Sequence, residues 1–262
     1  MLAFYFLLCF CEHSSLAGTF QVQVPKETLA IQDQPLVLEC SFSHSSHVIL
    51  DKLIVTWQRN DKDVAHSFYY GTDQLTYQSP RYLNRTSLYH EQLQQGNASL
   101  RLEPVFLEDA GLYICSVNTE EGTGKSTTFV TFAAYYLEPE LIVAPQIHHT
   151  SFCFRTMGYP EPRVQWLSTD GRHLSHNTEI LQSPANGGLF MVNSVLEAKA
   201  FVKLTFILEN MALNQTITRH ISLTQDVSNK IKCEHKRWML LLFIPFCLLL
   251  VFLVWRKKKP VE

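Results

Sequence analysis

The chain has 262 residues, 46% of them hydrophobic and 18% charged, and its 22 basic and 24 acidic side chains give a net charge of −2. This near-neutral balance excludes a broad surface for nucleic acid, because nucleic-acid-binding domains usually have a pI above about 9. The 10 glycines and 11 prolines are too few for a collagen-like or disordered chain. The length instead suits about two globular domains of about 100–200 residues each.

Residues 1–18 predict a secretory signal peptide. An apolar run at the N-terminus ends at Glu12, and small residues suitable for cleavage follow at Ala17 and Gly18. The basic residues that usually open such a peptide are missing, so a buried N-terminal strand or helix is the alternative interpretation.

Residues 19–133 predict an immunoglobulin-like V-type domain. Cys40 and Trp57 lie in segments that alternate like half-buried strands, and Tyr113 stands two residues before Cys115. An immunoglobulin sandwich needs this set, namely an inter-sheet disulfide, a tryptophan packed on it and a tyrosine corner. We therefore expect a Cys40–Cys115 disulfide, whose separation leaves room for the extra strands of a variable-type domain.

The sequence resembles the B7/butyrophilin family of T-cell co-signalling ligands, with the programmed-death ligands and the third B7 homologue as the nearest members. The resemblance covers about residues 20–255 and is carried by the segments Phe20–Pro25, Leu53–Trp57, His66–Phe68, Asn84–Thr86 and Gly96–Arg101. It implies a cell-surface ligand that binds a lymphocyte co-signalling receptor and regulates T-cell activation, without enzymatic activity or cofactor. It also implies a structural ion pair between Arg85 and Asp109.

The resemblance implies that partners dock on the sheet formed by strands C, C′, F and G of the V-type domain. Because side chains alternate along a strand, inward-pointing Trp57 and Tyr113 fix which neighbours point outward. The predicted partner-binding residues are Ile54, Thr56, Gln58, Ser67, Tyr69, Ile114, Ser116, Lys125, Thr127 and Phe129. Their four apolar members, Ile54, Tyr69, Ile114 and Phe129, are expected to form an apolar centre inside a polar rim.

Residues 134–225 resemble the family's constant-type domain, because Cys153 is followed by a Gly-Tyr-Pro turn and then by Trp166. The second core cysteine is missing, and Leu204 or Phe206 occupies its place. We therefore expect Cys153 to be a buried free thiol. Loss of such a disulfide typically costs about 2–5 kcal/mol, which burial of Phe206 would offset in part.

Residues 238–255 predict one transmembrane helix, so the predicted fold class is all-β, with two immunoglobulin-like sandwiches followed by this helix. The run contains no charge, is close to the roughly 20 residues that cross a bilayer, and has a tryptophan at each end. The basic residues at its C-terminal end mark the cytoplasmic side, and a charged tail argues against a removable lipid-anchor signal. We expect a type I single-pass cell-membrane protein with extracellular domains, a stalk at 226–237 and a cytoplasmic tail at 256–262.

Cys233, in the predicted stalk, has no mate if Cys40 pairs with Cys115 and Cys153 is buried. An odd cysteine in a secreted setting suggests intermolecular pairing, so we expect a disulfide-linked homodimer through Cys233. The alternatives are a free, capped or acylated thiol. A bridge to Cys153 is disfavoured because a core strand and a stalk should lie further apart than a disulfide spans.

Three Asn-x-Ser/Thr triplets, at Asn84, Asn97 and Asn214, predict N-glycosylation, and we expect at least two of them to be occupied. Gly122–Thr127 resembles a phosphate-binding loop but lacks its first glycine, so a hairpin loop is expected there. The histidines at 44 and 47, 148 and 149, and 173 and 176 stand outside any cluster of three or four zinc ligands. The sequence thus predicts no metal site and no enzyme. The rival to a co-signalling ligand is an immunoglobulin-type adhesion molecule without a signalling role.

Overall fold

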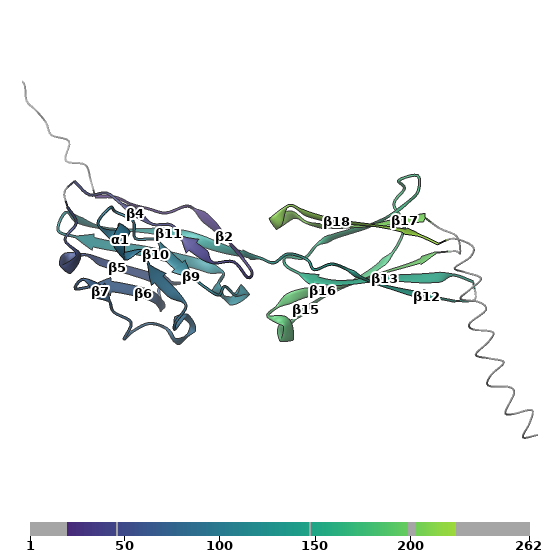
Figure 1. Ribbon diagram of the computed structural model, residues 1–262, viewed down its shortest axis with the longest axis horizontal. Helices are drawn as coiled ribbons and strands as arrows, with labels where there is room; N and C mark the ends of the chain where they lie inside the picture. Colours follow the sequence, from purple (N-terminus) through teal and green to yellow (C-terminus); the bar gives the residue numbers. More distant parts are fainter. Residues whose placement is uncertain (1–19, 46, 147, 199–202, 224–262) are drawn as a thin grey trace, which may run out of the picture. The chain divides into compact units, whose positions relative to one another are not determined.

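The computed structural model describes residues 20–45, 47–146, 148–198 and 203–223. The predicted signal peptide, stalk, Cys233, transmembrane run and cytoplasmic tail lie outside these residues. Within the described ranges, no helix is long and apolar enough to cross a membrane. The chain divides into two compact units, Met1–Thr131 and Phe132–Glu262, and both are built from β-sheets (Figure 1). The two predicted immunoglobulin-like sandwiches are therefore present.

The first unit packs a six-stranded front sheet against a smaller back sheet. The front sheet has the order β2-β11-β10-β5-β6-β7. Its strands are β2 (Glu27–Ile31), β5 (Ile54–Arg59), β6 (Asp63–Tyr69), β7 (Thr72–Asp73), β10 (Gly111–Thr119) and β11 (Gly122–Ala133). The back layer holds β3 (Leu36–Leu38), β9 (Leu100–Leu102) and β8 (Thr86–Leu88), with the separate pair β1 (Val22–Gln23) and β4 (Ser41–Phe42).

Short helical turns connect these strands. One α-helical turn, α1, covers His90–Leu93, and 3-10 turns cover Leu50–Lys52 (η1), Pro80–Tyr82 (η2) and Leu107–Asp109 (η3). Thr119 pairs with Gly122, so the β10–β11 turn consists of Glu120 and Glu121 alone. The expectation of a hairpin loop over Gly122–Thr127 is therefore wrong. These residues already belong to β11, because the tight turn lets strand pairing begin immediately.

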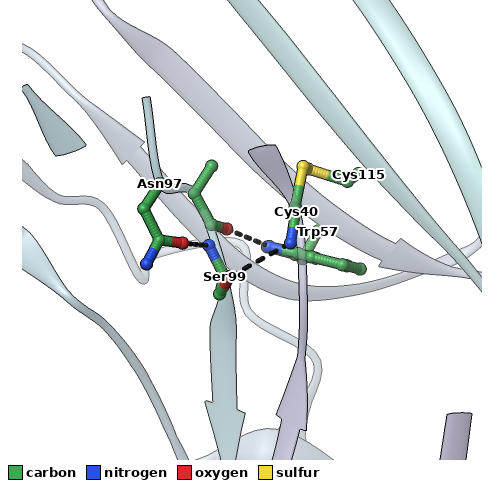
Figure 2. The surroundings of a disulfide bond; sticks show 6 residues. Cys40, Trp57, Asn97, Ser99 and Cys115 are labelled. Carbon is green, nitrogen blue, oxygen red and sulfur yellow. Dashed lines mark hydrogen bonds between the residues drawn. A yellow bond between two sulfur atoms is a disulfide. The ribbon is translucent and has the colours of Figure 1, made fainter. Parts of the chain in front are cut away.

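The core of the first unit is organised around the Cys40–Cys115 disulfide, which confirms the predicted bridge. The two Cα atoms are 6.5 Å apart. Trp57 is fully buried and its Nε1 donates a hydrogen bond to the Ala98 carbonyl oxygen at 2.8 Å. Figure 2 shows this tryptophan beside the bridge. The indole thus satisfies its one donor while filling the space between the sheets.

The second unit is a sandwich of a four-stranded and a three-stranded sheet. The first sheet has the order β12-β13-β16-β15 and the second the order β14-β17-β18. The strands are β12 (Glu140–Pro145), β13 (Thr150–Gly158), β14 (Arg163–Ser168), β15 (Asn177–Ser183), β16 (Leu189–Ala198), β17 (Lys203–Asn210) and β18 (Gln215–Ser222), with 3-10 turns at Pro184–Asn186 (η4) and Met211–Leu213 (η5). Trp166 lies fully buried between the two sheets.

Cys153 is half-buried rather than part of the core, which corrects the expectation of a buried thiol. Side chains alternate along β13, and the buried positions are Phe152 and Phe154. Cys153 therefore points to the opposite side of its sheet. The core position belongs to Phe154, whose ring centroid lies 4.2 Å from that of Phe206. Both rings also contact Trp166.

Candidate docking face

The outward side of the front sheet brings the predicted partner-binding residues together. Residues paired across antiparallel strands project from the same face of a sheet, and the register arranges this face in four rows. The first row is Phe129–Leu112, the second Thr127–Ile114–Gln58, the third Lys125–Ser116–Thr56–Ser67, and the fourth Asn118–Ile54. Tyr69 extends the fourth row, because its neighbour Phe68 pairs with Val55, the neighbour of Ile54.

The apolar side chains lie at the two ends of this face and not at its centre. Ile114 is only 6% exposed, because it sits on a central strand between Gln58 and Thr127. Ser67 is buried as well. Among the predicted residues, the large exposed apolar groups are Phe129, at 49%, in the first row and Ile54, at 42%, in the fourth. The expected apolar centre is therefore wrong, and a mostly polar middle separates two apolar ends.

Leu112 belongs to this face but was not among the predicted residues. It pairs with Phe129 and is 38% exposed, so the two side chains form the first-row apolar end. The alternation that placed Ile114 outward also places Leu112 outward, two residues earlier on β10. The sequence therefore contained the signal that identifies it.

Tyr70 is a second residue that the sequence prediction missed. Tyr69 pairs with Thr72, which leaves Tyr70 and Gly71 as a two-residue hairpin turn. Their φ angles are +54° and +74°, a conformation in which a tyrosine is rare and strained. A Cβ on Gly71 would lie 2.7 Å from Asp51 Oδ1, and the positive φ there favours glycine as well. Tyr70 is 76% exposed and its ring contacts that of Tyr69.

A small polar cluster anchors the β6–β7 edge of the same sheet. Asp73 Oδ1 lies 2.8 Å from His90 Nε2 and 3.0 Å from His66 Nε2, the second contact being poorly aligned for a hydrogen bond. The buried His66 ring also lies 3.0 Å from the Thr86 hydroxyl through Nδ1. Burial alone would raise the pKa of Asp73, but the contacts with the two histidines outweigh it and lower that pKa. The carboxylate thus stays charged and holds the edge strand.

Arg85 and Asp109 are in contact at the base of the first unit, as the family resemblance implies. The Asp109 side chain is 1% exposed and the Arg85 side chain 13%. The Arg85 guanidinium donates to both carboxylate oxygens of Asp109 and, at 2.7 Å, to the Arg81 carbonyl oxygen. Asp109 also accepts a hydrogen bond from the Phe106 backbone amide. These hydrogen bonds compensate the desolvation of both charges. The Arg85–Asp109 pair lies outside the four rows of the docking face.

The three glycosylation acceptors lie outside the docking rows. Asn84 and Asn214 are exposed and have positive φ angles of +58° and +49°, at turns. Asn97 is half-buried and precedes β9 in the back layer. Across the described residues, no group of three or more histidine, cysteine, aspartate or glutamate side chains is arranged to bind a metal ion.

Comparison with known proteins places this fold in a family. The immunoglobulin V-set domain model matches residues 23–132. A CD276 antigen homolog from Xenopus laevis is 32% identical over 195 residues, which cover 72% of this chain and 63% of that protein. Programmed cell death 1 ligand 1 from Mus musculus is 29% identical over 192 residues, or 72% of this chain and 65% of that protein. The matched region is thus less than two thirds of either relative's length.

A solved structure extends the likeness beyond the V-set region. The crystal structure of bovine butyrophilin superposes with a TM-score of 0.67 at 21% identity, covering 79% of this chain and 100% of that one. This likeness shows a shared fold. The relatives are non-enzymatic immunoglobulin proteins, and this chain is likewise not an enzyme. By sequence and by fold, the chain is a homologue of the B7/butyrophilin family.

Proposed function

We propose that this chain is a cell-surface ligand that binds a T-cell co-signalling receptor and thereby regulates T-cell activation. The observation that carries the proposal is its similarity to proteins named as such ligands, including programmed cell death 1 ligand 1. The homologous proteins act at the cell surface, which agrees with the predicted export and anchoring of this chain.

The proposed binding surface is the outward face of the front sheet. It combines two apolar ends, exposed Ile54 with half-buried Tyr69 and exposed Leu112 with exposed Phe129, with a polar middle that includes Lys125. Protein interfaces join apolar contacts with polar groups that fix orientation, and a few aromatic anchors usually dominate the binding energy. We assign the anchor roles to the two ends and an orienting role to the polar middle.

Tyr70 adds a protruding aromatic ring beside the fourth row. Residues in strained backbone conformations cluster at functional sites, and an observed outlier supports a hypothesis of function. The neighbouring β5–β6 turn has Asn60 and Asp61 at its positive-φ positions, residue types that tolerate this conformation. A tyrosine in place of such a residue raises the energy of the fold. We assign the Tyr70 side chain a direct contact with the receptor.

The docking face is tested with the full-length chain displayed on cells and offered to activated T lymphocytes. Phe129→Asp and Ile54→Asp should each reduce binding by about 30-fold, because losing an anchor costs about 2 kcal/mol. Leu83→Asp is the matched control, since Leu83 is 61% exposed but lies outside the front sheet. Its binding should equal that of the wild-type chain. Unchanged binding in both face variants would place the docking site elsewhere.

The same assay separates signalling from adhesion. A co-signalling ligand should change cytokine release by T cells that receive an antigen signal, and the face variants should abolish this change. An adhesion molecule would bind other cells bearing the same chain and leave cytokine release unaffected. Self-association as the sole activity would reject the proposal.

Tyr70→Asn should separate stability from binding. Asparagine tolerates the positive φ, so the variant should gain about 1 kcal/mol of unfolding free energy, while binding to T cells falls. Both are measured on one preparation, by thermal denaturation and by the cell assay. Asn60→Gln, at the first positive-φ position of the neighbouring β5–β6 turn, should instead lose stability and keep binding. A Tyr70→Asn chain that binds normally would remove Tyr70 from the interface.

A further inference from the structure

A groove of about 640 Å³ opens beside the back layer of the first unit. It forms because the N-terminal segment changes sheets: β1 pairs with β4, whereas β2 joins the front sheet. The link at Val24 and Pro25 therefore leaves the back layer, and the side chains of Val37, Glu39 and Ser41 are exposed at the groove. Polar and aromatic side chains line much of the groove, among them Gln23, Glu39, Ser41, Tyr89, Gln92 and Asn97.

The Asn97 side chain is held in a fixed orientation at the wall of this groove. Its Oδ1 accepts a hydrogen bond from the Ser99 amide at 2.9 Å, and its Nδ2 donates to Gln92 Oε1 at 2.5 Å. The Ser99 hydroxyl in turn accepts a hydrogen bond from the Cys40 amide at 3.0 Å (Figure 2). The Asn-Ala-Ser triplet is thus tied to the disulfide-bonded core through its serine, and the asparagine faces the groove.

We propose that Asn97 carries an N-linked glycan whose first sugars occupy this groove. The transfer joins the anomeric carbon of a lipid-pyrophosphate-linked oligosaccharide to Asn97 Nδ2. The bond from that carbon to the pyrophosphate oxygen breaks, and the lipid pyrophosphate and one amide proton are released. Nδ2 carries two hydrogens and the transfer replaces one of them, so the glycosylated nitrogen keeps one hydrogen that it can donate to Gln92 Oε1.

The chemistry of the groove suits a carbohydrate. Its volume falls within the range of about 300–1,000 Å³ that small-molecule sites span. Gln23, Glu39 and Ser41 offer hydrogen-bonding groups to sugar hydroxyls, and Tyr89 and Pro25 offer apolar surface to the sugar ring. The occupant is covalently attached at the wall, so its effective concentration is high and a weak affinity is enough to keep it in the groove. Asn84 and Asn214 project from exposed turns and do not line this groove.

The test is enzymatic release of glycans from the full-length chain produced in cells that add N-glycans. Glycopeptide mass spectrometry should find Asn97 occupied. An amidase that removes N-glycans should release the Asn84 glycan readily from the native protein. Release at Asn97 should be about tenfold slower or more, since the sugar must first leave the groove, which corresponds to about 1.4 kcal/mol. In denaturant the two rates should become equal.

Two variants sharpen the test without relying on a folding defect. Asn97→Asp keeps the oxygen that accepts the Ser99 amide and removes the glycan, so hydrogen exchange should speed up in β3 and β4. Asn84→Asp, the matched control, should leave that exchange unchanged. An unoccupied Asn97, or equal native release rates at Asn97 and Asn84, would overturn the proposal.

Discussion

The two sandwiches of this chain stabilise the same kind of core in different ways. In the first, the Cys40–Cys115 bridge joins the sheets beside Trp57. In the second, Phe154 and Phe206 pack between the sheets against Trp166. A covalent bridge stabilises mainly by restricting the unfolded chain, whereas the aromatic pair acts through burial in the folded one. An immunoglobulin core therefore requires filled volume next to its tryptophan, and the disulfide is one of two means to provide it.

The largest expected effect comes from removing the bridge in the first sandwich. For a separation of 75 residues, Cys40→Ala combined with Cys115→Ala should lower the unfolding free energy by about 4–5 kcal/mol. Guanidinium unfolding followed by hydrogen exchange of peptides from each unit measures the loss. The second unit should unfold at an unchanged midpoint. An equal shift in both units would show that their stabilities are coupled and would break the comparison.

Phe206→Ala should destabilise the second sandwich almost as much. The side chain is fully buried, and truncating a buried phenylalanine typically costs about 3–5 kcal/mol. Phe206→Leu should cost clearly less, because most of the apolar volume remains. Calorimetry of the full chain, with and without reductant, then assigns the two transitions. Reductant should lower the first transition only, and a Phe206→Ala chain with an unchanged second transition would contradict the assigned core.

Asp109→Asn should cost about 3 kcal/mol in the first sandwich, since it leaves the Arg85 charge without its buried partner. The matched change in the second sandwich is Glu138→Gln, which removes an exposed partner of Arg219. That variant should melt at the wild-type temperature, because exposed ion pairs are screened by water and salt. Thermal denaturation of both variants at low and high salt gives the comparison. A small loss in Asp109→Asn would mean that the buried pair is dispensable.

The smallest expected effect is that of Cys153→Ser, within about 0.5 kcal/mol, as is usual for substitutions away from the core. A cysteine in the core would behave differently, because serine would bring an unpaired hydroxyl into an apolar site. The variant thus distinguishes the structure from the expectation of a buried thiol. A loss comparable to that of Phe206→Ala would reinstate Cys153 as a core residue.

Sequence patterns predicted the architecture because its determinants are local and periodic. Cys40, Trp57, Tyr113 and Cys115 identify the first sandwich by their order, and alternation from Trp57 and Tyr113 places the outward rows correctly. In the second sandwich the same reasoning failed at one residue. It took Cys153 as the inward position, whereas the buried neighbours are Phe152 and Phe154.

Exposure on the docking face was harder to predict than direction. Ile114 points outward as expected, but neighbours on two adjacent strands cover it, and their combined bulk is not visible in one segment of sequence. Tyr70 was not predicted, because what distinguishes it is a positive φ angle that follows from the Tyr69–Thr72 pairing and is not visible in the sequence. The alternation of residues along a strand thus predicts which way each side chain points. How much of that side chain is exposed depends on its neighbours in the assembled sheet.

The brevity of β7 has a further consequence for how other molecules approach the front sheet. A long, free edge strand would offer its backbone amides and carbonyls to any extended chain, which is the usual route to sheet-to-sheet aggregation. Here the sheet ends in only two residues, Thr72 and Asp73, and the Asp73 carboxylate is engaged by His66 and His90. That edge is too short to serve as a template for a foreign strand. Contacts at the β7 edge must therefore be made through side chains, which makes recognition there selective and disfavours pairing of two copies of the chain through this edge.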